Sequence, residues 1–495
     1  MDHHLVLLPI VIPLAAAAIA LLLRRYGPLQ AGWSLAAMLS SLAASLLLLA
    51  RVWASGQPVV FQSGGWPAPM GISLVGDLLA ATLAVMSQAV LALGIVYALG
   101  SKDKVVTYPG FYPLFLTLAA GLTGAFLTGD LFNLFVFAEL LVFSGTILTA
   151  ISDDRYGTEA AYKYFYMSLM ASAFLLLAVG SLYVSYGTLN MADLARSVAM
   201  NPGAPLLPAA IAFLFAAFMV KSAVFPFHFW QPDFHTASPT AVSAMLSSVV
   251  VKLGVYGFIR MTTLLFAEQA TTIRSLLVIL GVAGVVYGGL GAVGTHNAKR
   301  MLAYSTLAQV GFILVAIGWG TPLALAAAIV FAFNHSLAKA AMLMLAGALA
   351  SRAPVKTAAF DVLTGLGRQL PVAGALFLVG GLALVGVPPT NGFINKMVLF
   401  RSGIEAGQYG SLAAVAFASI LTLVYVVRAF QRIWWQLPAP GVTAKPGGDR
   451  LLAPALLIAG VLLLGLWPEP LVSLAQATAA WLAEPQAYIQ AVLGG

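Results

Sequence analysis

The amino-acid sequence predicts an all-α membrane protein that crosses the bilayer about fourteen times, and its composition carries most of this prediction. Of the 495 residues, 61% are hydrophobic and only 8% are charged. A soluble domain carries roughly 25% charged residues, so this chain has too few to cover a water-soluble surface. The apolar residues also form continuous runs of about the 20 residues that a membrane helix needs, without the alternation of a β-barrel.

We place the predicted spans at the apolar runs that contain few charges. They are 5–23, 31–50, 78–99, 110–129, 131–150, 164–189, 206–230, 240–259, 275–294, 301–319, 323–350, 371–400, 411–431 and 451–467. The first run lacks a basic start and an Ala-x-Ala cleavage region, so we expect a retained helix rather than a signal peptide.

The composition also excludes several classes of function. The absence of cysteine rules out disulfide scaffolds, iron–sulfur centres, thiolate metal sites and cysteine nucleophiles. The net charge of +8 includes no basic run of the kind that binds nucleic acid, and a modest cationic excess is typical of cytoplasmic loops. The sequence has no phosphate-binding P-loop, so energy for transport has to come from an ion gradient or a partner.

The distribution of Lys and Arg among the loops predicts that both termini lie outside. With the N-terminus outside, the inner loops hold fourteen of these residues and the outer loops five, as the positive-inside rule requires. An even number of spans then places the C-terminus outside as well. The outer five are Arg51, Arg196, Arg260, Arg274 and Arg401.

The segments between the spans predict a single membrane domain. The longest, 51–77, 190–205 and 432–450, are rich in Pro, Gly or small polar residues, and we expect none to fold alone. Residues 468–495 contain Glu469, Glu484 and Pro485, and we interpret them as a surface tail, with a helix lying on the membrane as one form of it.

Six ionisable residues lie well inside predicted spans, where a charge costs about 3 kcal/mol on insertion scales. A single intramembrane lysine can snorkel to the interface or join two helices through an ion pair. Four lysines with one central glutamate leave most lysines without an acidic partner, and a buried lysine in that state can release its proton. The set therefore predicts a proton relay, whose members are Glu139, Lys221, Lys252, His335, Lys339 and Lys396.

Two spans contain prolines close to these lysines. Proline removes a backbone donor and clashes with the preceding turn, so we predict broken helices rather than the simple kinks that are the alternative. Broken helices in corresponding positions of two halves are typical of transport sites and indicate a repeat over roughly 110–260 and 275–430. The predicted breaks are Pro226 and Pro232 after Lys221, and Pro388 and Pro389 before Lys396.

Three further titratable residues follow Pro226. His228 could pass protons between helices or form a structural hydrogen bond. His235 and Asp233 lie at the predicted membrane edge, where they could give protons access to the relay or cap the next helix. We find neither a metal-ligand cluster nor a Ser-His-Asp or paired-carboxylate arrangement, and predict no catalytic residue, no metal and no cofactor.

Four stretches resemble the proton-pumping antiporter-like subunits of respiratory complex I and of the Mrp cation/proton antiporters. They are GAFLTGDLFNLFVFAELL, VKSAVFPFHFWQPDFHTASPTAVSAMLSSVVVKLGVYGFIR, NHSLAKAAMLMLAGAL and GVPPTNGFINK. The start DHHLVLLPIVIPL, the segment 64–81, lysine at position 396 and the compact length without a long lateral C-terminal helix most resemble the D-type component of Mrp antiporters.

The resemblance implies two inverted five-helix repeats, each with a broken helix. It divides the chain into an N-terminal three-helix segment, two antiporter repeats, and a C-terminal helix with a surface tail, over 1–100, 105–265, 270–435 and 445–495.

The resemblance also implies roles for the relay residues. Glu139 pairs with Lys221 and tunes its protonation, and Lys252 with His335 or Lys339 carries protons across the centre. Lys396 is the terminal group toward the other side or a neighbouring subunit.

The leading hypothesis is a proton-translocating subunit of a multisubunit Na⁺(K⁺)/H⁺ antiporter in the cell membrane, which works with companion subunits, protons and monovalent cations and is not itself an enzyme. The alternative is the equivalent subunit of a complex I-type NADH dehydrogenase or membrane-bound hydrogenase. An intramembrane transferase would need an exposed Asp/Glu pair or a large outer loop, and a structural scaffold would leave the buried lysines without a reason.

Overall fold

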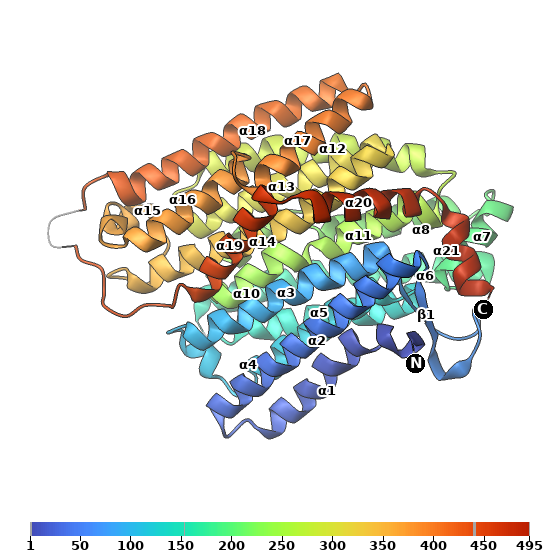
Figure 1. Cartoon of the computed structure of the whole chain (residues 1–495), viewed down its shortest axis with the longest axis horizontal. Coiled ribbons are helices and arrows are strands. Elements are labelled where there is room, and N and C mark those ends of the chain that lie inside the picture. The colour runs from blue at the N-terminus through green and yellow to red at the C-terminus, as the bar shows by residue number, and fades with distance from the viewer. Residues whose placement is uncertain (1, 153, 439–441, 495) are drawn as a thin grey trace.

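The protein is a bundle of tilted helices that run in roughly the same direction (Figure 1). A computed structural model describes residues 2–152, 154–438 and 442–494. Both chain ends lie at the same end of the bundle (Figure 1), which we call the terminal face. The loops that contain Asp103, Ser152, Asn297, Lys356 and Asp449 meet around one cavity at the opposite end, which we call the loop face.

Nine helices in the described part of the chain are long and apolar enough to cross a membrane. They are α2 (Gly27–Ser55), α3 (Leu78–Gly100), α5 (Leu131–Ala150), α6 (Arg155–Tyr186), the continuous helix Thr240–Leu265, α12 (Ala270–Gly294), α13 (Ala298–Trp319), α14 (Pro322–Arg352) and the continuous helix Tyr409–Trp435. The helix Thr240–Leu265 comprises α10 (Thr240–Met245), a π-helical turn η4 (Leu246–Val250), α11 (Lys252–Arg260) and a second π-helical turn η5 (Met261–Leu265), and Tyr409–Trp435 comprises α18 (Tyr409–Phe430) and the π-helical turn η7 (Gln431–Trp435).

Shorter helices occupy the remaining predicted spans. Four are apolar, and a further pair is bent by 76° at a short break. They are α1 (Leu8–Leu22), α4 (Phe111–Leu127), α8 (Leu207–Lys221) and α16 (Pro371–Val385), and the bent pair α19 (Leu452–Leu466) and α20 (Glu469–Leu482). The all-α fold is confirmed, while the number of crossings stays a prediction.

Acidic side chains at three helix starts show why the boundaries fall where they do. Asp77, Asp130 and Asp154 each accept a hydrogen bond from a backbone N–H in the first turn of α3, α5 and α6. The first N–H groups of a helix have no intrahelical partner, so an N-cap carboxylate stabilises the start by about 1 kcal/mol. These charges therefore mark helix ends.

Two helices are interrupted beside Lys221 and Lys396. Helix α8 ends at Lys221, and α9 (Trp230–Ala237) follows an irregular stretch that contains Pro226. Helix α16 ends before Pro388 and Pro389, and α17 (Asn391–Glu405) continues after them. The prediction for Pro232 is wrong, because this residue lies in the first turn of α9, where the missing N–H would have had no intrahelical partner.

The remaining elements are short and lie outside the long helices. They are η1 (Asp2–Val6), β1 (Val59–Gln62), η2 (Ser63–Gly65), β2 (Ser73–Gly76), η3 (Lys104–Thr107), α7 (Met191–Met200), α15 (Phe360–Leu363), η6 (Leu366–Gln369) and α21 (Pro485–Leu493). Strands β1 and β2 form an antiparallel pair in which Val59 faces Gly76 and Gln62 faces Ser73. This pair lies at the terminal face (Figure 1).

The segment after residue 467, which we interpret from the sequence as a surface tail, forms two helices that dock on the bundle. Helix α20 packs against α14 and α3, and α21 packs against α7. In α20 the residues Leu471, Ala475 and Ala479 are buried, and their spacing of four places them on one helix face. This apolar stripe explains why the segment docks on the bundle.

The assignment of Arg260 to an outer loop is also wrong. Arg260 ends α11 inside the continuous helix Thr240–Leu265, and only 3% of its side chain is exposed. It forms an ion pair of 2.7 Å with Asp77, which is fully buried.

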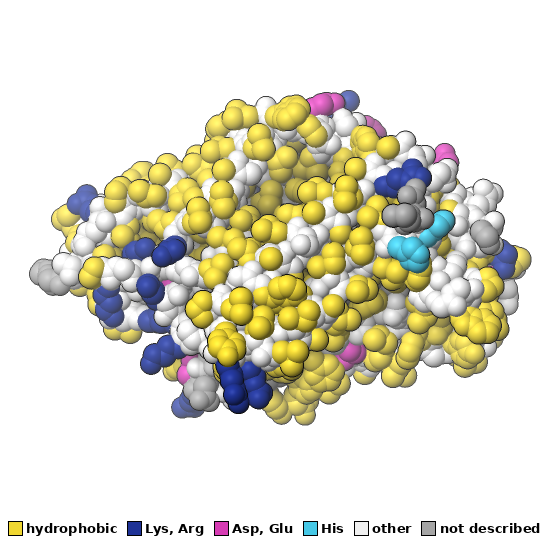
Figure 2. Space-filling view, turned by 60° about the horizontal axis from the view of Figure 1, so that its bottom comes forward, with side chains coloured by type: hydrophobic (Ala, Val, Ile, Leu, Met, Phe, Trp, Pro, Cys, Tyr) yellow, Lys and Arg dark blue, Asp and Glu magenta, His cyan; other side chains and the backbone are white. Residues whose placement is uncertain are grey.

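The outer surface of the bundle is strongly apolar. Hydrophobic side chains cover much of the face in Figure 2, while Lys and Arg gather mostly toward one end. Leu22, Val184 and Leu466 are each more than two-thirds exposed. Soluble monomers rarely expose large contiguous apolar patches, so this surface fits a multi-pass membrane protein.

Candidate relay site

Glu139 and Lys221 lie close together between α5 and α8, as predicted. The Lys221 Nζ is 3.9 Å from the Glu139 Oε1, and the two side chains are 7% and 20% exposed. Ser172 of α6 lies between them, because its hydroxyl contacts the Glu139 carboxylate and is 3.5 Å from the Lys221 Nζ. The three helices therefore hold a cation, an anion and a bridging hydroxyl in one small group.

Lys252 and His335 form a second group at the centre of the bundle. The Lys252 Nζ lies 2.5 Å from the His335 Nδ1, and both side chains are buried. Lys252 begins α11 one residue after the π-helical turn η4 and its cap Val251, and such turns are frequent at functional sites. The other ring nitrogen of His335 has no hydrogen-bond partner in the described part of the chain.

Lys339 faces a different helix from His335, although both residues belong to α14. Its ammonium donates to the Ser305 hydroxyl at 2.7 Å and to the Leu302 carbonyl at 3.1 Å, both on α13. Ser305 is in turn 2.7 Å from the Tyr425 hydroxyl of α18. Lys339 thus begins a chain of hydroxyl groups that leads toward α18.

Lys396 lies beyond the second helix break, on α17. Its ammonium has no hydrogen-bond partner in the described residues and lies 5.6 Å from the ring centroid of Phe312. The lysine stem passes over Gly386, where a Cβ would come within 2.6 Å of the Lys396 Cδ. Gly386 has φ +90°, a backbone conformation that favours glycine.

Three buried asparagines join the second break to α14 beside His335. The Asn334 Nδ2 donates to the Asn395 Oδ1 at 2.7 Å, and the Asn391 Nδ2 donates to the Asn334 Oδ1 at 3.0 Å. Asn334 is adjacent to His335 in sequence, and Asn395 is adjacent to Lys396. This amide network fixes the helix that carries Lys396 against the helix that carries the central histidine.

The predicted access residues divide between the surface and the interior. Asp233 forms ion pairs of 2.8 Å with Lys163 and with Arg300 at a surface hollow of about 550 Å³. Partial burial alone would raise the pKa of Asp233, but the hydrogen bond from Lys163 and the charge of Arg300 hold it below its ordinary value. Asp233 therefore stays ionised at neutral pH.

The two histidines of this region are buried. His235 of α9 lies 3.2 Å from the Ser243 hydroxyl through its Nδ1, and its Nε2 has no partner among the described residues. The ring of His228 packs against Phe225 and Tyr287. Each of these histidines therefore has one ring nitrogen without a partner among the described residues, and His228 also packs against two aromatic rings.

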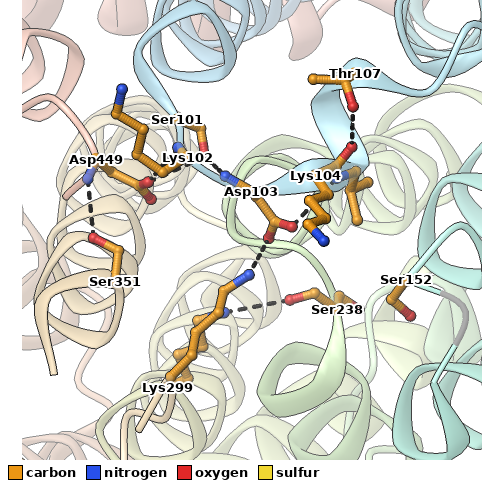
Figure 3. A network of polar contacts seen from close by, with 12 residues as sticks. Ser101, Lys102, Asp103, Lys104, Thr107, Ser152, Ser238, Lys299, Ser351 and Asp449 are labelled. Carbon is orange, nitrogen blue, oxygen red and sulfur yellow. Dashed lines mark hydrogen bonds and ion pairs between the residues drawn. The ribbon is translucent and has the colours of Figure 1, made fainter. Parts of the chain in front are cut away.

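A polar cavity of about 240 Å³ opens near α9 on the loop face, and Asp103, Lys299 and Asp449 are among its lining residues. The Lys299 ammonium donates to the Ser238 carbonyl at 3.3 Å (Figure 3). Asp449 accepts the backbone N–H of Lys102 at 2.7 Å. Because Ser238 directly follows α9, water in this cavity would come close to the helix that carries His235.

Several polar partners of the relay lysines were not singled out from the sequence. Ser172 and Ser305 are examples, and a single hydroxyl in an apolar helix is too common to be a signal. In the described residues, no group of three or more His, Asp or Glu side chains could hold a metal ion.

The fold and the row of buried lysines together define a membrane protein of the antiporter-like class. The family described as NADH:quinone oxidoreductase/Mrp antiporter, transmembrane, matches residues 128–422, and the chain belongs to this family. The predicted resemblance is thereby confirmed.

Individual relatives come from both branches of the family. The chain is 32% identical to the D-type component of the Na⁺/H⁺ antiporter of Alkalihalophilus pseudofirmus, with 99% of each chain covered. It is 35% identical to the N-type component of the NADH-quinone oxidoreductase of Desulforudis audaxviator, with 96% of this chain and 98% of the relative covered.

Two solved structures share the whole fold. A chain of the Mrp complex from Dietzia sp. matches with a TM-score of 0.92 and 27% identity, covering 100% of this chain and 99% of the other. A chain of the membrane-bound sulfane sulfur reductase, an archaeal respiratory membrane complex, matches with a TM-score of 0.89 and 29% identity over 99% of each. The protein is therefore a homologue of subunits of multisubunit membrane complexes.

Proposed function

We propose that the protein is the proton-translocating subunit of a multisubunit Na⁺(K⁺)/H⁺ antiporter. The observation that carries the proposal is the row of buried lysines on α8, α11, α14 and α17, of which Lys221 has a nearby carboxylate. Burying cations in a membrane domain is costly, and an intramembrane ionisable residue is by default a functional one. The assignment to an antiporter is supported by the D-type antiporter components among the relatives.

The proposed path begins at the loop face and runs along the bundle. Protons reach His235 from the polar cavity beside α9, and Glu139 stabilises the protonated form of Lys221. Lys252 and His335 exchange the proton at the centre, and Lys339 and Lys396 pass it toward the second half. Broken helices beside Lys221 and Lys396 supply flexible backbone at the two ends of the path.

We further propose that cation exchange takes place elsewhere in the complex. The described residues offer no cluster of acidic side chains suited to a metal ion, and Na⁺ prefers oxygen ligands. Both termini are proposed to lie outside, since the loop face carries most of the basic loop residues counted above.

The replacement of Lys221 and Lys396 by arginine tests the relay. Arginine keeps the positive charge but holds its proton above about pH 12, so Lys221→Arg and Lys396→Arg should assemble and fail to transport. The measurement is proton flux in everted vesicles, normalised to assembled complex. Lys445→Arg, at an exposed position, is the matched control. Full flux in the double variant Lys221→Arg/Lys396→Arg would show that neither lysine has to release its proton and that both are structural.

The second candidate function is that of a proton-pumping subunit in a redox-driven complex. It is favoured by the 35% identity to an NADH-quinone oxidoreductase component and by the match to a respiratory membrane complex. Expression with the neighbouring genes in a sodium-sensitive host separates the two. Restored sodium resistance supports the antiporter, and proton pumping that needs a reduced substrate supports the redox complex.

A further inference from the structure

A buried polar cluster lies between the central lysine and the terminal face. Lys252, Tyr256 and Arg260 follow one another at intervals of four residues on α11 and so share one helix face. Tyr256 is 1% exposed and Arg260 is 3% exposed. The helix thus places a fixed cation two turns from the lysine of the proposed relay.

Elements that are distant in sequence hold this cation in place. The Arg260 guanidinium pairs with Asp77, the N-cap of α3, at 2.7 Å. It also lies 5.0 Å from the ring centroid of Tyr256 and 5.1 Å from that of Tyr488 on α21. The arginine is therefore clamped between two aromatic rings and one carboxylate.

Stability alone does not account for such a cluster. The desolvation of a buried ion pair often exceeds the Coulombic gain, and well-packed apolar residues of the same volume are commonly as stable. The hydroxyl of Tyr488 also has no hydrogen-bond partner in the described part of the chain, and such a buried group costs free energy.

We propose that Arg260 is an electrostatic barrier that closes the terminal-face side of Lys252. Arginine does not release its proton under physiological conditions, so it cannot pass a proton on. Its charge also raises the energy of any excess proton on the Tyr256 side, as positive groups do in pores that exclude protons. Without it, the Tyr256 hydroxyl would offer Lys252 a shortcut across the membrane.

This proposal rests on the proton relay proposed above and adds a direction to it. A proton that reaches Lys252 is prevented from leaving along α11 and has to continue laterally toward Lys339 and Lys396. Asp77 and Tyr488 are positioning residues, because they act by holding the guanidinium.

The test is passive proton leak through the intact complex reconstituted into liposomes. A potassium diffusion potential drives protons, an internal pH dye reports them, and sodium is absent. Arg260→Gln should raise the leak by about tenfold or more, since one unit charge a few ångströms away changes a barrier by at least that factor. Arg260→Lys, which keeps the charge, should leak less than Arg260→Gln. Arg196→Gln is the matched control, because Arg196 pairs with Asp193 at the surface.

Two double variants separate a lost barrier from a damaged fold. Asp77→Asn/Arg260→Gln leaves no unpaired buried charge, so this double variant should assemble and leak protons. If Arg260→Gln alone does not assemble, the leak is measured in the double variant instead. Lys252→Met/Arg260→Gln should return the leak to the wild-type level, because the shortcut would start at Lys252. Wild-type leak in the assembled neutral variants, or a leak that survives Lys252→Met, overturns the proposal. A failure of the relay itself would instead show in the arginine replacements of Lys221 and Lys396.

Discussion

Neutralising Glu139 tests how strongly one carboxylate controls the lysine row. At 3.9 Å, two unit charges interact by about 4 kcal/mol at an effective dielectric constant of about 20. Solvent reaches 20% of the Glu139 side chain, so we halve this value to about 2 kcal/mol. If proton uptake by Lys221 limits transport, Glu139→Gln should slow it about thirtyfold.

The assay is sodium-driven proton flux in everted vesicles, followed by quenching of a pH-sensitive dye and normalised to assembled complex. Glu159→Gln is the matched control, because Glu159 also pairs with a lysine, Lys163, but both side chains are more than one-third exposed. Glu139→Asp, which keeps the charge, should retain part of the flux. Wild-type flux in fully assembled Glu139→Gln would refute the argument that this ion pair sets the rate.

Three further predictions concern the relay, the break and the orientation. Lys221→Ala and Lys396→Ala should each abolish flux, and the double variant should be no worse, because groups that act in one pathway are not additive; additive partial losses would indicate parallel routes. Gly386→Ala should lower flux because its new Cβ would lie 2.6 Å from the Lys396 Cδ. The control is Gly407→Ala, which should transport normally. Gly407 also has a positive φ, but a Cβ there would have no neighbour within 4 Å. Glu484→Cys introduces a single cysteine into a cysteine-free chain, and this thiol should react with an impermeant reagent added outside intact cells. If the thiol reacts only in everted vesicles, the orientation is inverted.

The sequence predicted the helices and the charged members of the site well, because charges are conspicuous in apolar runs. Glu139, Lys221, Lys252 and His335 are examples, whereas the pairing of Glu139 with Lys221, and of Lys252 with His335 or Lys339, came from the family resemblance. The hydroxyl partners Ser172 and Ser305 were missed, since nothing in a single sequence distinguishes them from other small polar residues in helices.

The error at Arg260 has a simple cause. The predicted span ended at residue 259, and the π-helical turn η5 extends the helix to Leu265. A shift of only a few residues turned a buried cation into an apparent loop charge. The docking of α20 was missed for another reason, because the prolines and glutamates at the two ends of this segment suggested a surface position and concealed its stripe of buried residues.

The ion pairs Asp77–Arg260 and Glu139–Lys221 have a consequence for how the chain enters the membrane. In both pairs the acid precedes its basic partner in the sequence, Asp77 before Arg260 and Glu139 before Lys221. Inserting a helix with a central Arg or Lys costs about 3 kcal/mol per residue. During synthesis, each of these cations therefore emerges toward a bilayer that already holds its counterion. The earlier helices therefore assist insertion of the later ones, and loss of Asp77 should first impair the step in which the translocon releases α11 into the membrane.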